Sequence, residues 1–512
     1  MRLLIENCRL LGKELCSVVV DGGRIAEVHR GGAPGVPAGT ARLDANEGAL
    51  FPGLTDTHCH PFEYGWLKRS VDLRGASNIT AVRLRLSARL ARSSAGEWVT
   101  GMGWDQEAMA ERRMPSREDV DDLTRRNPVV LSRVCGHIAL LNTAAIESLG
   151  LTDRTGPEWE RDASGALTGI VKESALAEVL ARVPKGPDRS ASDLQSVEAE
   201  ALRFGLVALH CIVSPDGYKE ELEALAALKS SGSLSLRYRA YIPPEALAFV
   251  EERGLRKSLA DGRARINGVK VYADGSLGAR TAALWEPYSD EPANSGLLRH
   301  SDEELQGIVE RADAQGYQVI IHAIGDRAVD QAVEALSRVA GGRNPKRHRV
   351  EHASMLPRSI RTKMAKHGIR ASVQPAFITS DTWALSRLGP DRVRDLYPLK
   401  SMLSEGLLVS GGSDSPIESL SPVLGVWSAM VRGEASLESL TFDEAIGLYT
   451  ASAGSNGFDD AGGLQEGGVA DLTLLDSDVA GLHPAMVRKV GVAAVVASGA
   501  LAYSALGPPS TA

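Results

Sequence analysis

Two histidines separated by a single residue, His58 and His60, follow an apolar stretch of the chain. Side chains two positions apart on a β-strand point to the same side, whereas Cys59 between them points to the opposite side. Two imidazoles on one side of a strand end can share one divalent metal ion. The pair by itself is also compatible with two unrelated histidines in a surface turn.

Three further potential ligands stand at the ends of apolar runs: His322 in VIIHAIGD, His352 in HRVEHAS and Asp414 in LLVSGGSDS. Taken singly, each could equally be a packed or a solvated residue. Lys270 lies inside the apolar run INGVKVYADG, where a lysine is costly unless its charge is paired or removed. Its end could reach solvent. Alternatively, a deprotonated lysine could capture CO₂, because the resulting carbamate is an anion that can bridge two metals.

These residues need a scaffold that brings them together, and the pattern of the chain predicts one. Near-continuous apolar runs alternate with helical segments, which is typical of a parallel sheet covered on its faces. The runs are 50–58, 206–213, 235–242, 266–273, 317–322, 347–353, 369–374 and 407–413. Capping boxes at Ser192 and Ser301 predict helix starts. We therefore expect an α/β fold, a (β/α)8 TIM barrel with its active site at the carboxyl ends of the strands.

Both ends of the chain have the pattern of short strands and turns, so segments 1–50 and 456–512 are expected to pair into one small β-sandwich domain. The uncharged stretch 490–507 is expected to be a hairpin around Ser498 and Gly499 and not a membrane span. The barrel is expected at 51–455. The segment at about 62–190 is too long for one connection and should form an insertion with its own strands.

Taken together and in order, these pieces resemble the amidohydrolase superfamily, and within it the amidohydrolase-3 branch, which includes N-substituted formamide deformylases. The resemblance rests on GLTDTHCHP, GVKVYADGSLGARTAAL, IHAIGDRAVD, RHRVEHAS and GGSDSPIES. It extends to GMGWDQ and CGHIALLNTAA in the insertion, and so covers nearly the whole chain. It implies a metal-dependent hydrolase on the barrel fold.

The resemblance also implies a centre of two divalent metal ions, for which zinc is the expected metal. The implied ligands are His58, His60, Lys270, His322, His352 and Asp414. The two histidines of the first strand and Asp414 would hold one ion, and the other two histidines would hold the second. Lys270, carboxylated by CO₂ or bicarbonate, would bridge both ions together with a hydroxide. Asp414 would take the proton of the attacking hydroxide and pass it to the leaving nitrogen. Lys270 would also count as catalytic, because its carbamate holds the two ions together.

Four further residues could bind the substrate or orient a metal ligand, and each of them could instead have a purely structural role. His137 could hold the substrate from the insertion, or be a structural histidine in a turn. Arg280 could bind a substrate carboxylate or carbonyl, or form an ion pair. Trp104 could line the pocket, or pack in a core. Asp326 could orient a ligand imidazole, or cap a helix.

The expected reaction is hydrolysis of a C–N bond other than a peptide bond, such as an amide, a formamide or a cyclic amide, in a small molecule. One alternative is a mononuclear deaminase on the same fold, although such enzymes generally lack the bridging lysine that Lys270 would provide. A second alternative is a non-catalytic regulatory relative, whose signature would be the loss of a ligand. A serine hydrolase is disfavoured because GGSDS lacks the final glycine of a Gly-x-Ser-x-Gly elbow.

Composition narrows the class of partner. The chain has 512 residues, 57 Lys and Arg against 65 Asp and Glu, and a net charge of −8, so we expect no nucleic-acid binding. Its five cysteines are widely spaced, which favours a reducing compartment, and the N-terminus lacks an uninterrupted apolar segment. We expect a cytoplasmic protein without membrane attachment, whose partner is a small-molecule substrate, with a homodimer as the candidate assembly.

Overall fold

The computed structural model describes residues 2–32, 34–134, 137–183, 187–432, 437–458 and 463–511. The chain divides into two compact units. The first comprises Met1–Pro61 and Leu194–Ala512, and the second comprises Phe62–Asp193.

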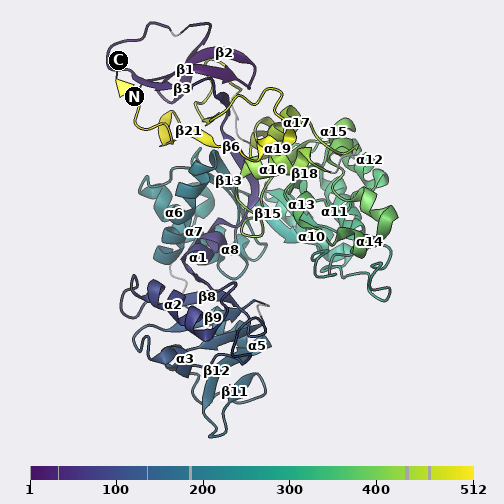
Figure 1. The fold of residues 1–512 in the computed structure, drawn as a ribbon. Helices are drawn as coiled ribbons and strands as arrows, with labels where there is room; N and C mark the ends of the chain where they lie inside the picture. The colour runs from purple at the N-terminus through teal and green to yellow at the C-terminus, as the bar shows by residue number, and fades with distance from the viewer. Residues whose placement is uncertain are drawn as a thin grey trace. The chain divides into compact units, whose positions relative to one another are not determined.

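An eight-stranded parallel sheet forms the centre of the first unit (Figure 1). Its strands, in spatial order, are β6 (Leu54–Cys59), β13 (Leu206–Ile212), β14 (Arg237–Ile242), β15 (Ala264–Tyr272), β16 (Gln318–Ala323), β17 (Arg349–His352), β18 (Arg370–Val373) and β19 (Val409–Gly411). Each of the predicted apolar runs overlaps one of these strands. The last strand returns to the first, because Asp414 N donates to His58 O at 2.7 Å and His60 N donates to Ser415 O at 2.8 Å. The predicted (β/α)8 barrel is therefore confirmed.

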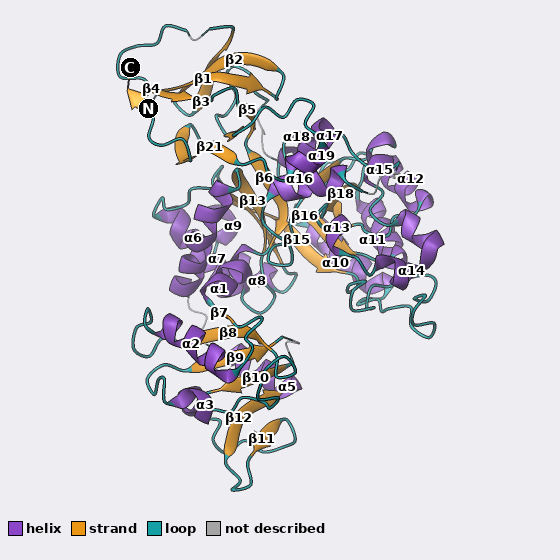
Figure 2. Ribbon diagram, in the orientation of Figure 1, coloured by secondary structure: helices purple, strands orange, loops and turns teal. Residues whose placement is uncertain are grey.

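Helices surround these strands and explain their apolar composition (Figure 2). Every residue of β13 is buried, for example, and α10 and α11 pack against β16. Most of α6 (Pro187–Arg203) belongs to this unit. It is followed by α7 (Tyr218–Ser230), α8 (Ala246–Glu252), α9 (Leu255–Ser258), α10 (Asp302–Ala314), α11 (Asp326–Val339), α12 (Arg358–His367), α13 (Phe377–Ser380), α14 (Ala384–Arg392), α15 (Leu399–Ser404), α16 (Pro422–Met430), α17 (Phe442–Gly447), α18 (Ala451–Asn456) and α19 (Pro484–Val487).

The two predicted capping boxes have different outcomes. Ser301 caps α10 reciprocally with Glu304, as expected. Ser192, in contrast, lies inside α6 (Pro187–Arg203), so the helix start predicted there is wrong. The helix begins earlier, at a proline, which is favourable in the first turn because that turn has no intrahelical partner for its N–H groups.

Both ends of the chain pair into one nine-stranded sheet. Its strands are β1 (Leu3–Leu10), β2 (Glu14–Asp21), β3 (Arg24–Arg30), β4 (Ala41–Asp44), β5 (Ala49–Pro52), β20 (Leu472–Leu475), β21 (Val492–Ala497), β22 (Ala500–Ser504) and β23 (Ser510–Thr511). Strand β1 pairs with β4 near its start and with β5 near its end, so the sheet forks there. Side chains from both branches share one hydrophobic core. The expected hairpin is present as β21 and β22.

The second unit is built on a six-stranded mixed sheet (Figure 2). Its strands are β7 (Val71–Asp72), β8 (Val99–Trp104), β9 (Val129–Arg133), β10 (Ile138–Leu141), β11 (Trp159–Arg161) and β12 (Leu167–Lys172), and its helices are α2 (Ile79–Leu90), α3 (Glu118–Asp121), α4 (Thr143–Ser148) and α5 (Glu173–Arg182). Helix α1 (Pro61–Arg69) precedes them. Trp104 is fully buried in one of the two cores of this unit, and its Nε1 donates to Leu131 O at 2.7 Å.

The helices were compared with the length and hydropathy of membrane-spanning segments. Among the described residues, no helix combines the length and the apolar character that a membrane-spanning segment needs.

The burial of Trp104 generates a prediction about its role. Trp104→Ala should destabilise the second unit by about 3–5 kcal/mol, because it leaves a large cavity. Trp104→Phe should cost less, about 1–3 kcal/mol, since it mainly leaves the Leu131 carbonyl unpaired. Protease resistance of the segment 62–193 in increasing urea measures both effects. An altered KM with unchanged protease resistance would instead assign Trp104 to a substrate pocket.

Candidate metal centre

The six predicted ligands converge at the carboxyl ends of the barrel strands. The positions are the end of β6 and the residue after it, the strands β15, β16 and β17, and the loop that follows β19. The ring centroids of His58 and His352 are 4.7 Å apart, and those of His322 and His352 are 4.5 Å apart. Parallel strands place these residues together although they lie far apart in the sequence.

His58, His60 and Asp414 form the tightest part of this cluster. Asp414 Oδ1 lies 3.4 Å from His58 Nε2 and 3.2 Å from His60 Nε2. One potential ligand atom of each residue lies within 4.8 Å of those of the other two. Two imidazoles and a carboxylate at this spacing fit a single divalent cation.

Three of the histidines each donate one ring N–H to the protein. His58 Nδ1 donates to Glu351 Oε2, His352 Nδ1 donates to Gln374 Oε1 at 2.7 Å, and His322 Nε2 donates to the Gly275 carbonyl at 2.9 Å. The second ring nitrogen of His322 and that of His352 are then unprotonated and have a free lone pair, whereas His58 Nε2 faces Asp414 Oδ1 at 3.4 Å. Metal-binding histidines are commonly oriented in this way.

Electrostatics keep two of these histidines neutral, which is the form that binds metals. Burial lowers the pKa of His322 to about 3 and lowers that of His352 well below its ordinary value, and nearby Lys270 and His58 act in the same direction. At Asp414, burial alone would raise the pKa, but hydrogen bonds from His58 and His60 hold it well below the usual value. The cluster therefore offers two neutral imidazoles, those of His322 and His352, and an ionised carboxylate.

Lys270 is the least satisfied group of the cluster. Its side chain is 1% exposed, and its Nζ forms no hydrogen bond with any residue that the structure describes. Its Nζ lies 4.7 Å from the centre of the Tyr272 ring. Burial lowers its pKa to about 8, although Glu351 and Asp414 act in the opposite direction. A buried amine without an acceptor is costly, and conversion to a metal-binding carbamate would remove that cost. The donor set as a whole fits a two-metal centre.

Sequence reasoning missed the groups that orient these histidines, Glu351 and Gln374. Both are fully or almost fully buried. The sequence does contain a signal for Glu351. Arg349 and Glu351 lie two positions apart in the apolar strand β17, where unpaired charges would be costly. Gln374 directly follows β18 and has no comparable signal in the sequence.

The carboxylate beside His322 is Asp274 and not Asp326. Asp274 Oδ1 lies 3.5 Å from His322 Nε2, and its oxygens accept hydrogen bonds from backbone N–H groups that include those of Ile324 and Gly325. Burial raises the pKa of Asp274 to about 7. Asp326 Oδ1 instead accepts from the backbone N–H of Trp285 at 3.0 Å.

The remaining substrate-binding candidates have partners within the protein. Arg280 forms an ion pair with Asp290 at 3.0 Å, which is the alternative that the sequence left open. His137 belongs to the second unit, where it is exposed and lies 3.2 Å from Glu173. Trp104 packs in the core of that unit.

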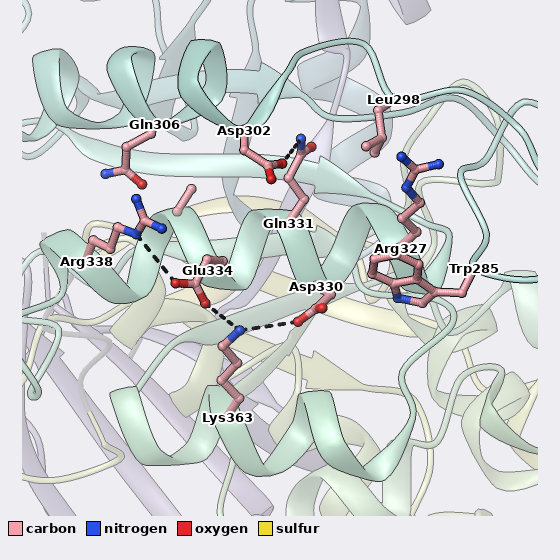
Figure 3. Close-up of a pocket in the computed structure, with 11 residues that line it drawn as sticks. Trp285, Leu298, Asp302, Gln306, Arg327, Asp330, Gln331, Glu334, Arg338 and Lys363 are labelled. Carbon is pink, nitrogen blue, oxygen red and sulfur yellow. Dashed lines mark hydrogen bonds and ion pairs between the residues drawn. The ribbon is translucent and has the colours of Figure 1, made fainter.

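A separate pocket of about 210 Å³ lies among α10, α11 and α12 (Figure 3). Four of its charged side chains are paired with one another: Lys363 contacts Asp330 at 3.3 Å and Glu334 at 2.6 Å, and Arg338 contacts Glu334 at 3.5 Å. None of the six predicted ligands lines this pocket. It is therefore a different site from the histidine cluster.

The chain is similar to several known proteins and solved structures. The N-substituted formamide deformylase of Arthrobacter pascens is 27% identical over 529 residues, which cover 96% of this chain and 95% of that protein. A crystal structure of an uncharacterized metal-dependent hydrolase from Pyrococcus furiosus matches with a TM-score of 0.79 and 30% identity, over 93% of this chain and 99% of that one. A second such hydrolase, from Pyrococcus horikoshii OT3, matches with a TM-score of 0.80 and 29% identity, over 95% and 99%.

A family model gives the assignment. The model described as the amidohydrolase family matches residues 42–503, which includes the whole barrel and all six predicted ligands. The match thus extends over far more than half of the chain. The chain belongs to the amidohydrolase family.

Proposed function

We propose that this protein hydrolyses a C–N bond other than a peptide bond in a small molecule, with two divalent metal ions, zinc being the expected metal. The observation that carries the proposal is the convergence of four histidines, Asp414 and the unsatisfied amine of Lys270 at one end of the barrel. His58, His60 and Asp414 would hold one ion, and the other two histidines would hold the second. Lys270, carboxylated, would bridge them.

The residues of the chain would divide the chemistry as follows. When bound, the ions would lower the pKa of a water molecule toward neutrality and polarise the substrate carbonyl. Asp414 stays ionised beside His58 and His60, so its carboxylate can accept a proton from the attacking water. It can then deliver that proton to the leaving nitrogen, which is otherwise a poor leaving group.

The similarity to a formamide deformylase supports an amide or formamide as the substrate. A turnover screen of the zinc-loaded protein against formamides, acyl-amino acids, lactams and aryl esters, with detection by mass spectrometry, tests the proposal. We expect cleavage of at least one amide-type substrate. Release of ammonia from an amino-heterocycle without any amide cleavage would instead establish a deaminase.

Lys270→Ala tests the bridge. The wild-type protein reconstituted with zinc should contain about two ions per chain. The variant should lose most of one ion and nearly all activity, because the anionic bridge between the ions is missing. Short carboxylic acids in solution should restore part of the activity by taking the place of the carbamate.

A lysine outside the cluster provides the control for that variant. Lys363→Ala removes an amine that pairs with Asp330 and Glu334 in the separate pocket, and should change neither metal content nor turnover. Wild-type metal content and activity in Lys270→Ala would contradict the bridging role.

The lowered pKa of Lys270 predicts a pH dependence for carboxylation. Only the neutral amine reacts with CO₂, and a pKa of about 8 makes about one-tenth of the amine neutral at pH 7, far more than for an ordinary lysine. When the bicarbonate concentration is adjusted at each pH to keep dissolved CO₂ constant, the rate of carbamate formation should therefore rise with pH up to about 8 and level off above it. ¹³C NMR after incubation with ¹³C-bicarbonate and zinc measures this rate. The same carbamate signal in Lys270→Ala would exclude the assignment.

Asp414→Asn tests the proton transfer. The amide cannot accept a proton, so kcat should fall by about 10²–10⁴-fold. The substitution also removes an anionic ligand, and metal content must therefore be measured on the same sample. A variant that retains its metal and its full kcat would show that another group carries the proton.

A further inference from the structure

A buried ion pair lies directly behind the first candidate ligand. Arg349 and Glu351 lie two positions apart on β17, and both side chains are completely buried. Arg349 Nε donates to Glu351 Oε1 at 2.5 Å. Burying both charges requires close pairing and further hydrogen bonds, because neither is solvated.

The pair contacts β6 at two neighbouring points. Glu351 Oε2 accepts the Nδ1–H of His58. Arg349 Nη2 donates to the carbonyl of Thr57 at 3.0 Å, which is the residue that precedes His58. One partner thus holds the imidazole, and the other holds the backbone that carries it.

Arg349 is itself anchored by a third strand. Its Nη1 donates to Tyr241 Oη at 3.0 Å, and its guanidinium lies 4.7 Å from the centre of the Tyr241 ring. The hydroxyl of Tyr241 in turn donates to Gln318 Oε1 at 2.8 Å. The guanidinium therefore has a fixed position from which it can orient Glu351.

His58 differs from the other oriented histidines in the charge of its acceptor. His322 donates to a backbone carbonyl and His352 to an amide, and both acceptors are neutral. His58 donates to the carboxylate of Glu351, whose other oxygen accepts from the guanidinium of Arg349. A charged acceptor makes the imidazole a stronger donor of its remaining lone pair.

We propose that the Arg349–Glu351 pair is a positioning device that sets the tautomer and the ligand strength of His58, so that the first metal ion binds tightly only while the pair is intact. The inference rests on the proposed function, because it assumes that His58 binds a metal. Neither residue touches the substrate or the reacting atoms in this assignment.

Glu351→Gln is the decisive variant. A glutamine has one acceptor oxygen, which Arg349 would claim, and its NH₂ group would then face His58 Nδ1. His58 would have to place its proton on Nε2, the nitrogen that should bind the metal. We expect zinc affinity, measured by competition with a chromophoric chelator, to fall by about 10–100-fold. The visible spectrum of the cobalt-substituted protein should change as well.

The double variant Arg349→Met/Glu351→Gln separates tautomer control from general damage. Without the guanidinium, the glutamine oxygen can again accept from His58. Zinc affinity should then recover in part relative to Glu351→Gln alone. A further, additive loss would overturn tautomer control.

Glu198→Gln is the matched control. Glu198 is a buried carboxylate in the same unit that accepts hydrogen bonds from Ser235, Leu236 and Tyr238 but lies outside the cluster. It should lower stability without changing zinc affinity. Should Glu351→Gln fail to fold, Glu351→Asp replaces it, since its shorter side chain cannot reach both partners.

The outcomes are distinguishable. Wild-type zinc affinity and cobalt spectrum in Glu351→Gln, or in Glu351→Asp if that variant is used, would overturn the inference and leave the proposed function intact. A wild-type protein that binds no zinc would overturn both.

Discussion

All eight barrel strands run in one direction and end at one rim, and the site depends on this constraint. A parallel sheet closed on itself brings every strand end to the same side of the molecule. Residues as distant in the sequence as His58 and Asp414 therefore meet, and the hydrogen bond from Asp414 N to His58 O joins the first strand to the last. The same contact that closes the barrel also assembles the most compact group of potential metal ligands.

The candidate ligands at this rim are buried or half-buried, and this burial shifts the protonation of the polar groups there. Without water, an imidazole stays neutral, a carboxylate needs donors, and an amine needs an acceptor. Glu351 and Gln374 accept hydrogen bonds from the ring N–H groups of His58 and His352, respectively. Asp414 receives hydrogen bonds from His58 and His60. Lys270 is the exception, because its Nζ has no acceptor among the described residues. The unmet need of this amine is the strongest structural indication that the site binds something more.

The contacts of each side chain distinguish between the functional and the structural role that the sequence left open for it. Arg280 is neutralised by Asp290, Trp104 is held in a core by Leu131, and Asp326 binds the backbone of Trp285. In the pocket among α10, α11 and α12, Lys363 is likewise paired with Asp330 and Glu334. The histidine cluster differs from these pairs, because it gathers several imidazoles, a carboxylate and a buried amine without an acceptor among the described residues.

The sequence by itself determined the barrel, because apolar strands and amphipathic helices are local patterns, and it determined the order of the six candidate ligands along the strands. A local signal failed where two nearby residues could each begin the same helix. The capping box predicted a start at Ser192, but the helix begins at Pro187. The sequence left Asp326 open between orienting an imidazole and capping a helix, and the structure places Asp274 beside His322, because proximity along the chain does not say which way a loop folds back. Only the tertiary structure decided the partners of the ligands, Glu351, Gln374 and Arg349. These contacts join different strands across the barrel, and their hydrogen bonds depend on register and side-chain direction, which no local pattern encodes.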